Sequence, residues 1–124
     1  MINNKMILSY GLEEKDLEVF KMSNIEYRVI TTETSHRKIE QIIEGAEGEK
    51  RDKKLPEEKV ILFNGFSDEE LDKIIKIIRA TIGKAPILAV VTDTSKEWTF
   101  DYLMEHLIEE REWYKKMQQE KGRS

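Results

Sequence analysis

The sequence contains no cysteine, which excludes disulfides, thiol catalysis and cysteine-based zinc sites. It also lacks a long hydrophobic run, because the longest apolar stretch, Ile87 to Val91, is far too short to span a bilayer. An excess of positive charge is missing as well, since the formal net charge is −4 and 37% of the residues are charged. Binding to a phosphate backbone needs a concentrated positive surface. We therefore expect neither a nucleic-acid partner nor a membrane partner.

No secretion signal is recognisable in the first residues. The start, Met1-Ile2-Asn3-Asn4-Lys5, has no apolar run behind a basic segment, so we expect a cytoplasmic protein. A chain of 124 residues is long enough for one compact domain and too short for two conventional ones.

The most informative feature present is an internal repeat. Residues 7–17 reappear as residues 61–71, and residues 29–35 reappear as residues 89–95. Neither half could bury a sufficient core alone, so we expect the two halves to share one. We place the first repeat at residues 5–46 and the second at residues 59–119. The segment between them, residues 47–58, is rich in charge and reads as a solvated, flexible linker.

Each repeat has the pattern of a strand, a helix, a second strand and a second helix. The first strands, residues 6–10 and 60–64, are mostly apolar and are each followed by a glycine. Ser67 and Glu70 then form the pattern of a capping box, which predicts a helix start. Ile87 to Val91 is apolar throughout and predicts a buried parallel strand, whereas residues 27–31 are more mixed and fit a sheet edge.

These elements predict an α/β fold in which tandem β-α-β-α units form one four-stranded, mainly parallel sheet. Parallel crossovers are right-handed in nearly all known cases. Two such units can share one sheet by placing their first strands side by side and growing outward, so we expect the strand order 2-1-3-4, with helices on both faces. We favour a doubly wound arrangement in which the first and third strands are parallel and a pseudo-twofold axis runs along them. The alternative is a sheet in which the two halves meet antiparallel.

The doubly wound arrangement predicts a binding site at the carboxyl edge of the sheet, where the winding direction reverses. The turn after the first strand would then face the turn after the third. The candidate ligand-binding residues at this edge are Tyr10, Gly11, Asn64, Gly65, Ser67, Asp93 and Thr94. The favoured explanation of each glycine is a tight strand-to-helix turn, because neither lies in a phosphate-loop motif.

We predict no catalytic residue, metal site or cofactor. Acidic residues at the two helix starts could approach a divalent cation, but acids are ordinary in the first turn of a helix and no calcium-loop spacing is present. His36 and His106 are the two histidines, and no serine has a recognisable histidine partner.

The last predicted helix gives the strongest interaction signal. Its inward stripe comprises Phe100, Leu103, Met104, Leu107 and Ile108. A second stripe lies about 100° around the helix and comprises Tyr102, His106, Trp113 and Met117. The helix could run for about twenty residues, longer than a sheet this small can cover, so these residues and Tyr114 are candidates for the interface of a homodimer. The aromatic side chains could instead fold back onto the linker.

Residues 60 to about 111 resemble a small, uncharacterised bacterial family with a domain of unknown function. The resemblance rests on residues 62–71, Leu-Phe-Asn-Gly-Phe-Ser-Asp-Glu-Glu-Leu, and on Val90-Val91-Thr92 followed by Trp98. It implies no activity, cofactor or catalytic residue. The first repeat departs from this pattern, because Tyr10 stands in the place of Asn64 and Trp98 has no counterpart.

The sequence therefore predicts a non-catalytic binding or protein-interaction module, acting as a homodimer through its last helix or with another protein. The alternative is a small-ligand or metal-dependent enzyme that uses the carboxyl edge of the sheet.

Overall fold

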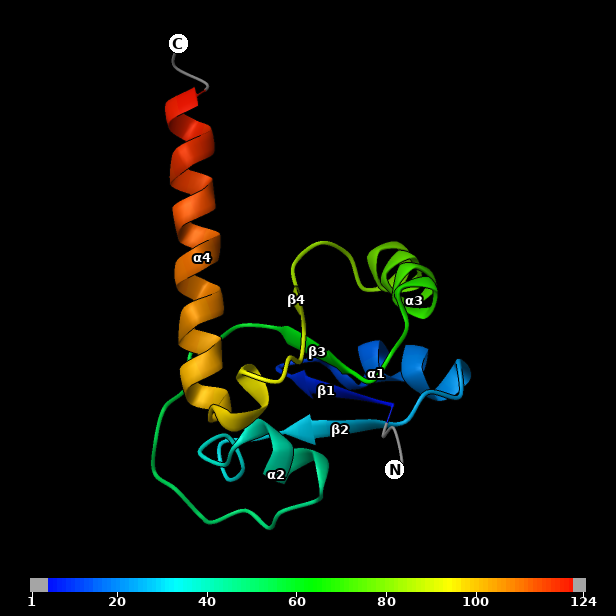
Figure 1. Cartoon of the computed structure of the whole chain (residues 1–124), viewed down its shortest axis with the longest axis vertical. Helices are drawn as coiled ribbons and strands as arrows, with labels where there is room; N and C mark the ends of the chain where they lie inside the picture. The colour runs from blue at the N-terminus through cyan, green and yellow to red at the C-terminus, as the bar shows by residue number, and fades with distance from the viewer. Residues whose placement is uncertain (1–4, 122–124) are drawn as a thin grey trace.

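The computed structural model describes residues 5–121. Residues 1–4, inspected above for a secretion signal, lie outside this range. The elements in chain order are β1 (Met6–Tyr10), α1 (Glu14–Met22), β2 (Tyr27–Ile30), α2 (Ile39–Ile43), β3 (Val60–Asn64), α3 (Asp68–Thr81), β4 (Ile87–Val90), the short 3-10 helix η1 (Ser95–Glu97) and α4 (Phe100–Lys121). Each half thus contains a strand, a helix, a strand and a second helix, as predicted (Figure 1).

The four strands form one sheet in the predicted order β2-β1-β3-β4. β1 pairs with β2 in parallel, and β3 pairs with β4 in parallel. The central pair is antiparallel, with Met6 opposite Asn64 and Tyr10 opposite Val60. The sheet is therefore mainly parallel, but the doubly wound arrangement with parallel central strands is wrong and the alternative of an antiparallel centre is correct.

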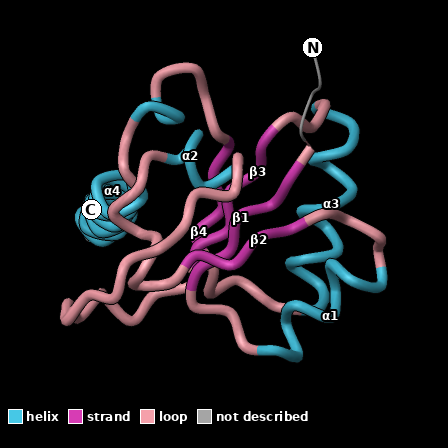
Figure 2. Tube along the Cα trace, turned by 90° about the horizontal axis from the view of Figure 1, so that it is seen from below, coloured by secondary structure: helices cyan, strands magenta, loops and turns pink. Residues whose placement is uncertain are grey.

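Helices cover both faces of the sheet, as expected. One core contains Ile7, Phe20, Ile61, Phe63, Ile74 and Ile78 and lies beneath α1 and α3. The other lies beneath α2 and α4, and its fully buried members include Leu8, Ile30, Ile39, Leu62 and Phe100. Figure 2 shows the two layers, with α2 and α4 on one side of the strands and α1 and α3 on the other. Adjacent strand residues enter different cores because side chains alternate across a sheet.

The two halves also meet above the sheet, where α2 and α4 begin. Lys38 and Thr99 form an antiparallel bridge. The Ile39 amide donates to the Trp98 carbonyl at 2.9 Å, and the Phe100 amide donates to the Arg37 carbonyl at 3.2 Å. These bonds satisfy amide groups at both helix starts, which lack partners within their own helices.

The capping box predicted for α3 is confirmed. The Glu70 amide donates to Ser67 Oγ at 3.2 Å, and the Ser67 amide donates to Glu70 Oε1 at 2.9 Å. This reciprocal pair fixes the start of the helix directly after the turn at Gly65, whose φ is 80°.

The prediction that the segment from Ile87 to Val91 is a buried strand is wrong. β4 lies at an edge of the sheet, and Val90 is 50% exposed. The other three residues of β4 are half-buried. β2 forms the opposite edge, as predicted from its mixed sequence. Apolar composition identified β4 as a strand, but it did not identify how many neighbours the strand has.

Candidate functional site

The predicted ligand-binding residues do not lie together but are divided between the two ends of the sheet, where the strands begin and finish. Because β1 and β3 are antiparallel, Tyr10 pairs with the first residue of β3 and Asn64 pairs with the first residue of β1. Gly11 follows Tyr10 at one end of the sheet, whereas Gly65 and Ser67 follow Asn64 at the other end. The expectation of one shared cleft between the two turns is therefore wrong. As binding residues, all seven candidates stay predictions.

The end of the sheet at Tyr10 contains a hollow of about 520 Å³, which is open to solvent on one side. Its lining is Tyr10, Gly11, Leu55, Pro56, Glu57, Glu58, Lys59 and Ala85. The Tyr10 hydroxyl donates to the Pro56 carbonyl at 2.7 Å. Burial raises the pKa of Tyr10, and the negative charges of Asp101, Glu57 and Glu58 raise it further. A phenol held neutral in this way acts here as a hydrogen-bond donor to the linker.

Gly11, at the same end of the sheet, occupies a position where a side chain would not fit. Its φ is 77°, in the left-handed region that side chains disfavour. A Cβ on this residue would collide with the Glu58 carbonyl oxygen. The glycine thus allows the linker backbone to approach the end of β1, which supports the structural explanation of this residue.

β3 and β4 are parallel neighbours, so the residues that follow them lie at the same, opposite end of the sheet. These residues include the candidates Asn64, Gly65, Ser67, Asp93 and Thr94. Asp93 is fully exposed and lies 3.7 Å from the Lys96 ammonium. The amide of Thr92 donates to Ser95 Oγ at 2.9 Å. Ser67 is engaged in the capping box described above. Ser67 and Asp93 therefore have structural partners in the fold.

An apolar hollow of about 400 Å³ lies at this second end of the sheet, between α3 and the turn before β2. It is lined by Lys5, Asn24, Ile25, Glu26, Phe66, Glu70, Lys73 and Ile74. The Lys5 ammonium donates to Glu70 Oε2 at 2.7 Å. This bond, together with the Ser67 amide, lowers the pKa of Glu70 to about 2. No sequence pattern pointed to this hollow, because its lining comes from three separate turns and helices.

The candidate metal ligands do not converge in the described part of the chain. Within residues 5–121, no group of three or more histidine, aspartate and glutamate side chains is placed to hold a metal ion. His36 lies 4.0 Å from Glu49 of the linker. His106 instead joins an aromatic cluster on α4.

A polar cluster that the sequence did not reveal joins the linker to both halves. Arg51 Nη1 donates to Ser35 Oγ and to the Thr32 carbonyl, each at 3.3 Å. Its Nη2 lies 3.4 Å from Asp101 Oδ2, and the Lys53 ammonium lies 3.6 Å from the same oxygen. The linker was expected to be solvated and flexible, but these contacts, with those of Pro56 and Glu58, hold it against the domain.

The last helix is as long as predicted. A helix of 22 residues extends for about 33 Å. The inward stripe packs on the sheet, with Phe100, Leu103 and Met104 buried. Trp98, Tyr102 and His106 form an aromatic cluster with ring centroids 4.7 to 5.1 Å apart. The start of α4 is thus tightly packed.

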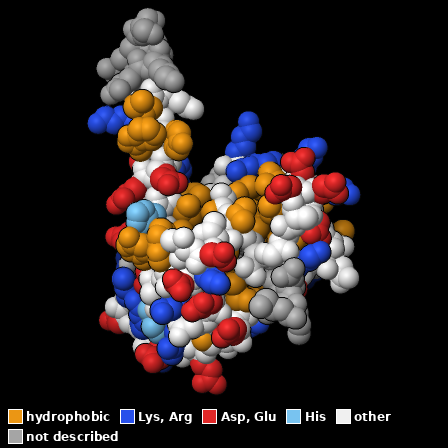
Figure 3. Space-filling model, viewed as in Figure 1, with side chains coloured by type: hydrophobic (Ala, Val, Ile, Leu, Met, Phe, Trp, Pro, Cys, Tyr) orange, Lys and Arg blue, Asp and Glu red, His pale blue; other side chains and the backbone are white. Residues whose placement is uncertain are grey.

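The end of α4 projects past the β4 edge and away from the body of the domain (Figure 1). We call residues 112–121 the α4 overhang. Trp113 is 56% exposed, Tyr114 60% and Met117 38%. Figure 3 shows hydrophobic side chains gathered on this part of the helix. The Trp113 and Tyr114 rings lie 5.2 Å apart and pack on each other, so within the described residues the prediction that they fold back onto the linker is not met.

Arg111 marks the boundary between the packed and projecting parts of α4. Its guanidinium donates to both oxygens of Glu58, at 2.7 and 2.6 Å. The bidentate pair lowers the pKa of Glu58, chiefly through the hydrogen bonds from Arg111. Beyond this pair, each side chain described in the overhang is exposed. Within residues 5–121, no helix combines the length and apolar character that a membrane crossing requires.

Comparison with known proteins agrees with the resemblance seen in the sequence. No curated protein and no solved structure shows significant similarity to this chain. Residues 59–114 match the sequence model of a family described as "Domain of unknown function (DUF3783)". The match covers β3, α3, β4 and the first two-thirds of α4, so the second half of this chain is similar to that family.

Proposed function

We propose that this chain is a non-catalytic protein-interaction module that forms a homodimer through α4. The observation that carries the proposal is the α4 overhang, which places Trp113, Tyr114 and Met117 on a projecting helix with large exposed areas. Aromatic residues and methionine are enriched at the centres of protein interfaces. Exposing them together on a rigid helix costs solubility, and a partner that covers them removes this cost.

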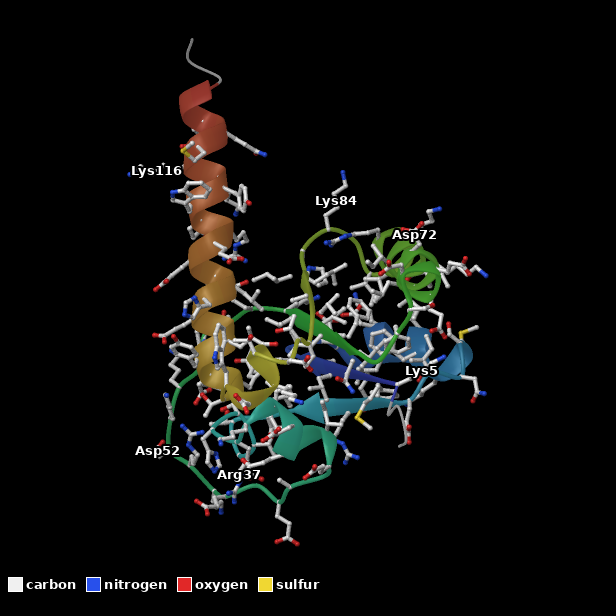
Figure 4. The ribbon with its side chains drawn as sticks, in the orientation of Figure 1. Lys5, Arg37, Asp52, Asp72, Lys84 and Lys116 are labelled. Carbon is white, nitrogen blue, oxygen red and sulfur yellow. The ribbon has the colours of Figure 1, made fainter. Side chains whose placement is uncertain are left out.

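The order of charges along α4 supports a second copy as the partner. Before Trp113 the exposed charges are mostly acidic, namely Glu105, Glu109, Glu110 and Glu112, whereas Lys115 and Lys116 follow Tyr114. The Lys116 side chain extends away from the domain (Figure 4). A twofold axis perpendicular to α4 makes the two copies of the helix run in opposite directions, so the acidic part of one would lie toward the basic part of the other.

Sedimentation or light scattering of the full chain and of a chain ending at Glu112 tests the proposal. We expect the full chain to have twice its 14.7 kDa monomer mass and the shortened chain to have the monomer mass. Trp113→Ser with Tyr114→Ser should also give monomers, whereas Gln119→Ser, a polar change on the same overhang, should leave the dimer intact. A full chain that stays monomeric at high concentration would contradict the proposal.

A further inference from the structure

We propose that the outer edge of β4 pairs antiparallel with the same edge of a second copy, which joins two four-stranded sheets into one continuous sheet. This inference rests on the proposed homodimer and names a second part of its interface. The starting point is the position of β4, an apolar strand at the edge of the sheet with Val90 half-exposed. An open edge strand is a template for pairing with another chain.

The register of β4 identifies the backbone groups available for this pairing. The Ile87 amide donates to the Lys59 carbonyl at 2.8 Å, and the Val91 amide donates to the Phe63 carbonyl at 2.9 Å. Because strand residues alternate, the amides and carbonyls of Leu88 and Val90 point away from β3. In the middle of a sheet such groups bond to a second neighbouring strand. Within residues 5–121, however, β4 pairs with β3 alone.

Both ends of the available edge are defined by the sequence. Pro86 precedes β4 and has no amide hydrogen to donate. The Thr92 amide beyond the strand is already bonded to Ser95 Oγ at 2.9 Å. The free segment therefore runs from Leu88 to Val90, with Ala89 at its centre. A twofold axis through Ala89 lets Leu88 of each copy exchange hydrogen bonds with Val90 of the other, a self-complementary arrangement.

The side chains of β4 suit this partner. Ala89 would face its own counterpart at a non-hydrogen-bonded position, where opposing Cα atoms approach to about 4.5 Å and a small side chain fits. β4 contains no charged residue, whereas β2 at the opposite edge carries the exposed Arg28. Charges on an edge strand discourage pairing with another sheet. The two edges thus differ in the way expected if β4 alone is the interface.

The α4 overhang and the β4 edge lie on the same side of the molecule. Figure 1 shows the end of α4 extending beyond β4, away from the body of the domain. The overhang of ten residues extends about 15 Å, and strands in a sheet are about 4.8 Å apart. The overhang is therefore longer than the spacing of an added strand, and we infer that one twofold axis serves both surfaces.

The absence of cysteine in the natural chain allows a direct test by crosslinking. Ala89→Cys should form a disulfide-linked dimer under mild oxidation, because the expected Cα separation suits a disulfide. The control is Val29→Cys on β2, the other edge strand, where Val29 is 44% exposed. We expect no crosslink there. Crosslinking of both variants to the same extent would indicate random collision and would overturn the proposal.

Proline substitution tests the hydrogen bonds themselves. Val90→Pro removes an outward amide without touching the bonds to β3, and it should raise the dimer dissociation constant by about tenfold or more. Val90→Thr keeps the amide and should leave the constant within about threefold. Val29→Pro removes an equivalent outward amide from β2 and should not affect it. Circular dichroism of each variant confirms folding.

The outcomes separate this inference from the proposed function. A dimer that is lost on shortening to Glu112, but shows no Ala89→Cys crosslink and tolerates Val90→Pro, supports the α4 interface and overturns the β4 interface. A dimer that survives the shortening and still crosslinks at residue 89 does the reverse. A chain that remains monomeric throughout overturns both.

Discussion

Arg111 on α4 donates two parallel hydrogen bonds to Glu58 at the end of the linker, with donor–acceptor distances of 2.7 and 2.6 Å. The pair connects residues far apart in the sequence and lies where α4 leaves the body of the domain. It attaches α4 to the linker directly before the α4 overhang begins. Both side chains are mostly buried, with 28% and 20% of their areas exposed, so solvent weakens the pair only in part.

Loss of this pair should destabilise the domain. Arg111→Ala is expected to lower the free energy of unfolding by about 1 to 3 kcal/mol, the range for hydrogen bonds to charged groups. Arg111→Lys should recover only part of this, because an ammonium cannot form the bidentate pair. Denaturant unfolding measures both. A double-mutant cycle with Glu58→Gln isolates the pairwise energy, and additive effects of the two changes would contradict a direct interaction.

Acid should weaken the same pair. The pKa of Glu58 is lowered in the folded state, so its contribution to stability is present above the unfolded pKa, ordinarily about 4.5. That contribution is lost as pH falls through the lower folded pKa. Unfolding measured between pH 7 and pH 3 should show a smaller loss of stability in Glu58→Gln than in the natural chain. Equal losses would show that Glu58 titrates normally.

Glu70 offers a residue-specific measurement of pKa. NMR titration should give a value of about 2, because Lys5 and the Ser67 amide both bond to the ionised carboxylate. Lys5→Met should move this pKa back toward 4.5, whereas Lys76→Met on the same helix should leave it unchanged. An ordinary pKa for Glu70 in the natural chain would show that the Lys5 contact is absent in solution.

Gly11 and Gly83 form a matched pair for testing close approach. Both have positive φ, of 77° and 105°, so the backbone conformation disfavours alanine at either position. A Cβ at Gly11 would also collide with the Glu58 carbonyl, while the space around Gly83 is open. Gly11→Ala should therefore destabilise the domain more than Gly83→Ala. Thermal unfolding of the two variants gives the comparison, and equal melting temperatures would exclude the collision.

Ser67 and Thr94 were both predicted as ligand-binding residues, and their structural roles differ. Ser67 accepts a hydrogen bond from the Glu70 amide, whereas Thr94 makes no side-chain capping bond at the start of η1. Ser67→Ala should cost about 1 kcal/mol, and Thr94→Ala should be close to neutral. Denaturant midpoints provide the measurement. A neutral Ser67→Ala would leave the capping role without support.

The sequence alone determined the local elements of this protein. The strands ending at Tyr10 and Asn64, the capping box at Ser67 and the length of α4 depend on contacts between residues a few positions apart, so their patterns can be read directly. The strand order also followed, because two strand–helix–strand units can share one sheet by placing their first strands side by side and growing outward. The exposed aromatic residues of the overhang were predicted because a long helix must extend beyond a small sheet.

Tertiary structure decided the direction of the central strands and hence the location of every surface. Side chains at Ile7, Leu8, Ile61 and Leu62 alternate between the two cores whether β1 and β3 are parallel or antiparallel, so the apolar pattern is the same in both cases. The long connection between α2 and β3 can reach either end of the sheet. In the folded chain the starts of α2 and α4 are bridged at Lys38 and Thr99, and the central strands are antiparallel. This direction places Tyr10 and Asn64 at opposite ends of the sheet, and the strand order leaves β4 at an open edge.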